Sequence, residues 1–367
     1  MSENQNIQSG SIIALSSLQP FVITSGEPEM RVWLYRIDPF TGVKSLLFSS
    51  VLSLSPDRTG ADAYRTTFRV DDIVSVVMRT HRLTFADFIF ECSQVSEENP
   101  DYTCSFSVLH DLIPAGKDPG SMRFLTDFPS RTMNRNARIT VSVFSMNDFR
   151  FTAKILLTDG SQVNAMRYSF TAAASPYTHI YEIPADLAEL AGKAMTEAGT
   201  KAAAVIFSIT DQSGDTADQM KIWLTDQTPA AELDYTNQYL IADRIHSFGS
   251  WTQKAVTKSS VANVDGQRIP YDIEPDNEIT VTTGPLDSMT ALRLAALGQA
   301  DPAVTIRLFA GAAQITRTGI ITASEIEISP DQKEMSRLKL TIDPGKRPSS
   351  LTPAQSRFTD HFTSQFN

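Results

Sequence analysis

The chain has few of the residues that mark disulfide-rich, membrane-spanning or nucleic-acid-binding proteins. Its 367 residues include only two cysteines, Cys92 and Cys104, too few for a disulfide-stapled secreted scaffold. They lie in neighbouring predicted strands, so a cross-strand bridge and a pair of reduced, half-buried thiols both fit the sequence. No apolar run approaches the roughly 18 to 20 residues that a membrane span needs. A formal net charge of -10 offers no overall attraction for nucleic acid.

The amino-terminal stretch "MSENQNIQSGSIIALSSLQP" has no basic region ahead of an apolar one. It therefore does not resemble a signal peptide. We expect a soluble product that stays in the cytoplasm where it is made, or leaves the cell inside an assembly.

Sequence motifs for catalysis are missing as well. The chain has no HExxH, CxxC, GxxxxGK[ST], GxSxG or GxGxxG, the patterns of common metal, nucleophile and phosphate sites. None of the histidines has a second histidine or a cysteine at metal-ligand spacing; they are His81, His110, His179, His246 and His361. The loop "DQSGDTAD" could hold Ca²⁺ through Asp211, Asp215 and Asp218 or be an ordinary solvated loop. We predict no catalytic, cofactor-binding or metal-binding residues, although 42 acidic residues leave a scattered-carboxylate hydrolase untested by sequence.

What the sequence does contain is a repeated β-strand pattern in an ordinary globular composition, with 41% hydrophobic and 20% charged residues. Short apolar runs alternate with polar residues and are separated by turn residues, as in "RVWLYRIDPFTG" and "KILLTDGSQ". We predict a mainly β protein of tandem β-sandwiches, immunoglobulin-like or jelly-roll-like. The predicted parts are a flexible amino-terminal arm, a β-sandwich, a second β-sandwich, a β-rich domain and a carboxyl-terminal docking tail, over residues 1–20, 21–115, 122–230, 234–347 and 348–367.

Two segments between strands predict helices. "PADLAELAGKAMTEAGT" indicates a short helix near 184–198, and "PLDSMTALRLAALGQ" indicates another near 285–298, each with proline near its start and glycine near its end. In the tail, Phe358, Phe362 and Phe366 are spaced four residues apart, which would line one face of a short helix. Such an apolar face has little of its own domain to pack on, so it indicates either a peptide that docks on a neighbouring subunit or a frayed end.

Aromatic residues supply the remaining candidates for recognition. In "IHSFGSWTQK" we predict a hairpin that turns at Gly249 with positive φ. Phe248 and Trp251 would anchor that hairpin on the domain core or on a neighbouring subunit. Trp33 and Trp223 lie in predicted strands, where a tryptophan usually packs in the core and sometimes forms a platform for a sugar.

The third region resembles a tail-associated structural family of tailed bacteriophages and prophages of Bacteroidetes. Over residues 235–345, "IHSFGSW" corresponds to an "FLNSFGxxE/T"-like element, "ALRLAALGQADPAVTI" to a helix with an "LxxLLxSPxV"-like end, and "RLKLTID" to an "F/LxYRL" strand. The chain departs from the family at His246, where the family tends to carry asparagine. It also has Gly298-Gln299-Ala300-Asp301 in place of a Ser-Pro ending.

The resemblance implies a virion protein of the tail or baseplate, with no catalytic residues to carry over. We therefore expect a non-enzymatic structural protein, assembled in the host cytoplasm, whose partners are copies of itself and other tail proteins. The alternative is a carbohydrate-binding β-sandwich protein that recognises a surface glycan.

Overall fold

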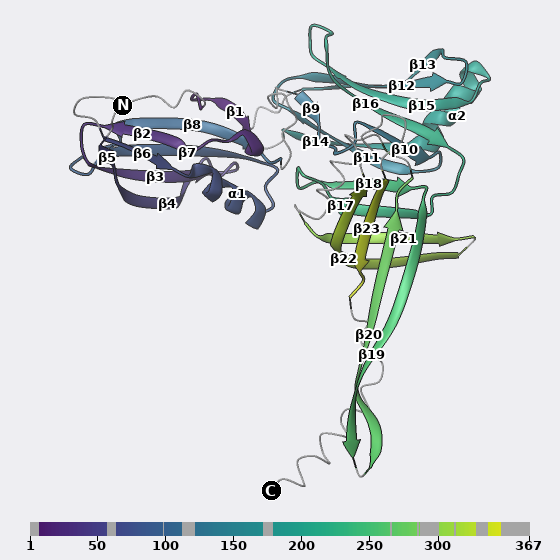
Figure 1. Cartoon of the computed structure of the whole chain (residues 1–367). Helices are drawn as coiled ribbons and strands as arrows, with labels where there is room; N and C mark the ends of the chain where they lie inside the picture. Colours follow the sequence, from purple (N-terminus) through teal and green to yellow (C-terminus); the bar gives the residue numbers. More distant parts are fainter. Residues whose placement is uncertain are drawn as a thin grey trace.

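The computed structural model describes residues 7–56, 64–97, 99–111, 122–171, 179–264, 266–284, 286, 301–311, 313–327 and 337–345. The protein is mainly β, as predicted, and its strands form several sheets (Figure 1). The described residues contain two α-helices, α1 (Val70–Thr80) and α2 (Leu187–Ala198). Neither is long and apolar enough to cross a membrane.

The first module is built from eight strands and α1. The strands are β1 (Ser11–Ala14), β2 (Phe21–Ser25), β3 (Glu29–Ile37), β4 (Lys44–Ser53), β5 (Ser55–Pro56), β6 (Tyr64–Phe68), β7 (Phe85–Gln94) and β8 (Tyr102–Leu109). The larger sheet has the order β1-β8-β7-β3-β4 and the smaller one the order β2-β6-β5. Alternate residues of both sheets and one face of α1 share a single apolar core, in which the ring centroids of Phe21 and Phe90 are 4.2 Å apart.

The second module has the same composition of elements. Its strands are β9 (Met122–Phe124), β10 (Ser130–Asn134), β11 (Arg138–Ser145), β12 (Phe149–Leu157), β13 (Gln162–Phe170), β14 (Ile180–Asp186), β15 (Ala202–Thr210) and β16 (Thr216–Thr225). They form sheets of order β10-β16-β15-β12-β13 and β14-β11-β9. Helix α2 packs its buried face into their common core. Asp186 caps the start of α2 by accepting hydrogen bonds from two backbone N–H groups, and Gly199 ends it in the left-handed conformation, as helix termini favour.

The two modules are copies of one topology. Strands β1, β2, β3, β4, β6, β7 and β8 correspond in chain order to β10, β11, β12, β13, β14, β15 and β16, and α1 corresponds to α2. In both, the first and last of these strands pair in parallel, while the ladders that join the other corresponding strands are antiparallel. In both, one extra residue is inserted at the same place of the fourth strand, Leu47 in β4 and Ala165 in β13. Seven strands and one helix of each module therefore agree in order, direction and bulge position, whereas β5 pairs with β6 and β9 pairs with β11.

The third module is a single sheet rolled around its own core. Its strands are β17 (Ala231–Thr236), β18 (Ala242–Ser247), β19 (Ser250–Val264), β20 (Gln267–Thr282), β21 (Ala303–Ala310), β22 (Ala313–Glu327) and β23 (Arg337–Asp343), in the order β18-β17-β21-β22-β23-β20-β19. The two ends of this order, β18 and β19, are consecutive in the chain, so the sheet must curl until its ends meet. Alternate residues of its strands and Phe128 fill the interior. The module is an open barrel.

The turn between β17 and β18 connects the barrel with both preceding modules. Tyr239 and Ile241 share a buried cluster with Leu109 at the end of β8 and with Leu125 and Phe144 of the second module. Such contact between all three modules fixes the position of the barrel.

Two sequence predictions need correction, and three others fall mostly or wholly outside the described residues. Residues 11–18 of the predicted arm are packed, because Ser11–Ala14 pair with β8 and Leu15 and Leu18 are buried. The alternation in "YRTTFRVDDIV" predicts a strand over residues 64–74, but only Tyr64–Phe68 form one. The helix α1 begins at Val70 and buries Val70, Val74 and Met78 on one side. The predicted helix near 285–298, the linker within 114–122 and the tail lie mostly or wholly outside the described residues.

Candidate assembly surfaces

The predicted hairpin around Gly249 is wrong, because the strands on its two sides do not pair. Strand β18 pairs with β17, and β19 pairs with β20. Phe248 and Gly249 instead carry the chain across the seam of the open barrel. The hydroxyl of Ser247 donates a hydrogen bond to the carbonyl oxygen of Thr282 at 3.0 Å, which joins the end of β18 to β20 across the seam.

Gly249 does not adopt the predicted positive φ. Its missing side chain serves a different purpose, since a Cβ at this position would lie 2.1 Å from the carbonyl oxygen of Thr282 and 2.7 Å from that of Thr283. Glycine is the residue that allows such close backbone approach. The seam therefore closes because residue 249 has no side chain.

The two aromatic residues predicted for interaction lie against their own chain. Trp251 is half-buried on the barrel core, and its Nε1 donates a hydrogen bond to the carbonyl oxygen of Phe309 at 3.0 Å. Phe248 is half-buried, with its ring centroid 6.1 Å from that of His246. Contact of either with a neighbouring subunit stays a prediction. Phe358, Phe362 and Phe366 lie outside the described residues.

A charged contact ties the second module to the barrel. The Arg131 guanidinium, on edge strand β10, lies 2.6 Å from the Asp243 carboxylate on β18, and both side chains are more than nine-tenths buried. Asp243 also accepts a hydrogen bond from the Thr126 hydroxyl at 2.7 Å. A buried ion pair with added hydrogen bonds holds one arrangement of its two partners, because separating them leaves a charge without compensation.

His246 extends this contact along β18. Its Nδ1 accepts a hydrogen bond from the backbone N–H of Asn134 at 3.0 Å, so the neutral ring carries its proton on Nε2. Nε2 lies 3.4 Å from Oε1 of Glu232. Burial lowers the pKa of His246 to about 4, although the Glu232 carboxylate opposes that shift. At neutral pH, His246 is therefore an uncharged structural residue between the second module and the barrel.

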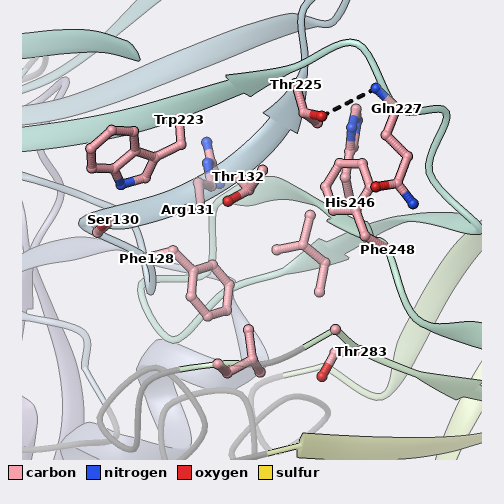
Figure 2. A pocket seen from close by; sticks show the side chains of 13 residues that line it. Phe128, Ser130, Arg131, Thr132, Trp223, Thr225, Gln227, His246, Phe248 and Thr283 are labelled. Carbon is pink, nitrogen blue, oxygen red and sulfur yellow. Dashed lines mark hydrogen bonds between the residues drawn. The ribbon is translucent and has the colours of Figure 1, made fainter. Parts of the chain in front are cut away.

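A cavity of about 330 Å³ lies beside these contacts, between the second module and the barrel (Figure 2). Arg131, His246, Phe248 and Trp223 line it from different elements. Trp223, expected in the core, is 41% exposed and has the Lys221 ammonium 3.7 Å from its ring centroid. The uncharged polar residues that line the cavity include Ser130, Thr132, Thr225 and Gln227.

The largest projecting feature is the hairpin of β19 and β20. Their register runs from Ser250 opposite Thr282 to Val264 opposite Gln267. Strand β23 pairs with β20 only over Ile279–Thr282, so within the described chain the rest of the hairpin has no third strand. The projecting part of β19, Lys254–Val264, lies opposite the part of β20 without a third strand and spans roughly 36 Å at the usual strand rise. Figure 1 shows the hairpin leaving the barrel.

The cysteines are buried thiols and are not joined by a disulfide. Cys92 lies opposite Tyr102 and Cys104 opposite Phe90, so the two are diagonal neighbours on one face of the sheet. Burial raises the pKa of Cys92 to about 11. The thiolate is therefore scarce at neutral pH, unlike that of a nucleophilic cysteine.

The acidic loop proposed for Ca²⁺ uses its carboxylates within the chain. Asp211 accepts a hydrogen bond from the Asp215 N–H at 2.9 Å, and Asp218 accepts one from the Phe124 N–H at 2.9 Å. No group of three potential metal ligands occurs among the residues that the structure describes.

Comparison with known proteins assigns no family. No family model matches the sequence, and no curated protein matches it.

Proposed function

We propose that this protein is a non-enzymatic structural protein of a bacteriophage tail or baseplate, which assembles with copies of itself and with other tail proteins. The sequence resemblance over residues 235–345 supports the tail assignment. The observation that carries the assembly role is the β19–β20 hairpin, whose outer part has no further strand among the described residues.

A two-stranded hairpin of this length is not expected to be stable by itself. Isolated hairpins are marginal in water, and a third strand or a packed face is needed for independent stability. The backbone groups on the outer sides of β19 and β20 are also open to pairing with another chain. A neighbouring protein that covers the hairpin in the assembled tail would satisfy both requirements.

Shortening the hairpin tests this role without removing the barrel. Residues 256–276 are replaced by Asn-Gly, which joins the paired residues Ala255 and Asn277 through a favoured two-residue turn. Pairing of Ile279–Thr282 with β23 is retained, so we expect an unchanged melting temperature. Analytical ultracentrifugation should show that the natural chain forms higher-order oligomers and the shortened chain does not.

Purified virions provide the second measurement. Mass spectrometry should find the full chain in tail particles at a fixed copy number, and particles produced with the shortened chain should lack it. A chain that is absent from particles and sediments as a monomer would contradict the proposal.

The second candidate function is glycan binding, and the exposed Trp223 favours it. Sugar rings pack on aromatic faces, and the hydroxyl and amide groups of Thr132, Thr225 and Gln227 in the same cavity match sugar hydroxyls. A glycan array should then give strong binding that Trp223→Ala abolishes. Trp33 is the other candidate platform and is half-buried in the first module, so Trp33→Ala is tested in the same way. Uniformly weak binding across the arrays would rule out this function.

A further inference from the structure

Strand β4 is an exposed sheet edge without the usual protection. It is the last strand of the larger sheet in the first module, and no strand of the described chain pairs with its outer side. Residues Ser45–Ser53, "SLLFSSVLS", contain no charged residue, no proline and no glycine. Natural edge strands are commonly protected from pairing by charges, proline or short length. In β4 the protective features are Lys44 at its first position and the bulge at the inserted residue Leu47.

The face of β4 that is turned away from the core carries two exposed apolar side chains. Leu46 is 55% exposed and Val51 is 46% exposed. Ser49 lies between them, opposite Trp33 of β3. Burying these side chains against a partner would stabilise the contact by roughly 25 cal/mol of free energy for each Å² of apolar surface removed from water.

The second module, which shares this topology, shows that the fold does not require an apolar edge. Strand β13 occupies the corresponding edge of the second module, and its bulge aligns Leu46 with Asn164 and Val51 with Ser169. All four positions are exposed. Ser49 corresponds in the same way to Arg167, so β13 carries a charge where β4 has none. The edge of β4 is therefore apolar at these positions, and that of β13 is polar and charged.

We propose that β4 pairs in antiparallel fashion with β4 of a second copy of this chain. The occupant follows from the self-complementarity of the strand. Because Leu47 is the inserted residue, Leu46 and Val51 each lie two paired positions from Ser49. A two-fold axis at Ser49 sets Leu46 opposite Val51 of the second copy, twice, on one face of a continuous sheet. Cross-strand apolar pairs of this kind stabilise antiparallel sheets. The one charged residue of β4, Lys44, would lie opposite Ser53 of the second copy in this register, so no like charges face each other.

This two-fold contact does not depend on the tail assignment. Matched variants of the two modules test it, with Leu46→Lys/Val51→Lys in β4 and Asn164→Lys/Ser169→Lys at the equivalent positions of β13. The β4 variant would place like charges opposite each other across the axis and should weaken dimerisation about tenfold or more. The β13 variant should dimerise like the natural chain. Sedimentation equilibrium over a concentration series measures both, and the thermal melting curves report whether each variant folds.

A cross-link locates the contact independently of stability. Ser49→Cys chains should form a covalent dimer under mild oxidation, because their thiols meet at the axis. Arg167→Cys is the matched control and should remain a single chain on a non-reducing gel, since the native cysteines are buried. A natural chain that is monomeric throughout, equal weakening by both lysine variants, or equal cross-linking by both cysteine variants would overturn the proposal.

Shortening the β19–β20 hairpin separates this proposal from the proposed function. Loss of higher-order oligomers with retention of the β4-dependent dimer would support both. A dimer in a protein that is absent from virions would leave the β4 contact standing and end the tail assignment.

Discussion

Gly249 and Thr282 touch through their backbones at the seam of the barrel. A Cβ on residue 249 would lie 2.1 Å from the Thr282 carbonyl oxygen, far inside the distance at which such atoms can coexist. The obstructing atom belongs to backbone that is held on one side by β19 and on the other by β23, so it has little freedom to move.

Gly249→Ala should therefore destabilise the barrel more than an ordinary glycine substitution. Overpacking in a well-packed site costs about 1 to 3 kcal/mol, and the shift required of paired backbone places this variant at the upper end of that range. Urea denaturation measures the loss. Gly284→Ala is the matched control, since its nearest neighbouring atom would be 3.8 Å away; equal losses in both variants would show that the close approach is not the cause.

His246 predicts a pH dependence of stability. Burial lowers its pKa in the folded protein to about 4, below the 6.5 of an exposed histidine. The unfolded chain thus binds a proton at higher pH than the folded protein, so stability increases as pH rises from about 4 to 6.5 and is constant above that range. The shift corresponds to about 3 kcal/mol in the unfolding free energy.

His246→Asn should remove this part of the pH dependence. Asparagine has no titrating group, and its side-chain oxygen can accept the Asn134 N–H in place of Nδ1. Denaturation at a series of pH values gives the slope for each chain. If the variant keeps the natural slope between pH 4 and 6.5, the dependence belongs to other groups, such as His110, whose pKa burial also lowers.

The buried cysteines predict slow thiol chemistry. A pKa of about 11 for Cys92 leaves little thiolate at pH 8, and both residues are inaccessible. A colourimetric thiol reagent should modify neither residue on the time scale that suffices for a small exposed thiol. Addition of guanidinium chloride should release two thiols per chain at once, whereas fewer than two would indicate a disulfide.

Much of the strand pattern could be predicted from sequence, because alternation of apolar and polar residues reports directly which side of a strand faces the core. Helix α1 was not predicted, because "VDDIVSVV" is rich in β-branched residues, which favour strands. Its spacing of Val70, Val74 and Met78 was the available signal, since these positions share one helix face.

The seam of the barrel and the shared topology of the first two modules could not be predicted from the sequence, because neither depends on local residue types. "HSFGSW" has the composition of a hairpin, but its strands pair with partners distant in sequence. The first two modules agree in strand pairing while their residues differ, as Leu46 and Asn164 illustrate. The same topology needs only the same pattern of buried positions, and many residue types can occupy each exposed position.

Arg131 and Asp243 provide the sharpest test of how the second module is held on the barrel. Because both side chains are buried, Arg131→Met or Asp243→Leu alone leaves the other charge without its partner and should cost about 3 to 5 kcal/mol. The double variant leaves neither charge, so its loss should fall well below the sum of the single losses. The difference is the coupling energy of the pair, measured from unfolding free energies in a double-mutant cycle.

The exposed ion pair of Lys339 and Glu325 is the matched control. Its atoms are 3.1 Å apart, with 47% and 64% of the side chains exposed, and surface pairs of this kind contribute less than about 1 kcal/mol. Near-additive losses at Arg131 and Asp243, like those of the exposed pair, would mean that this ion pair contributes little to holding the two modules together. Strong coupling at the buried pair and weak coupling at the exposed pair would show that this ion pair helps to fix the second module against the barrel, beside the apolar cluster at Tyr239 and Ile241.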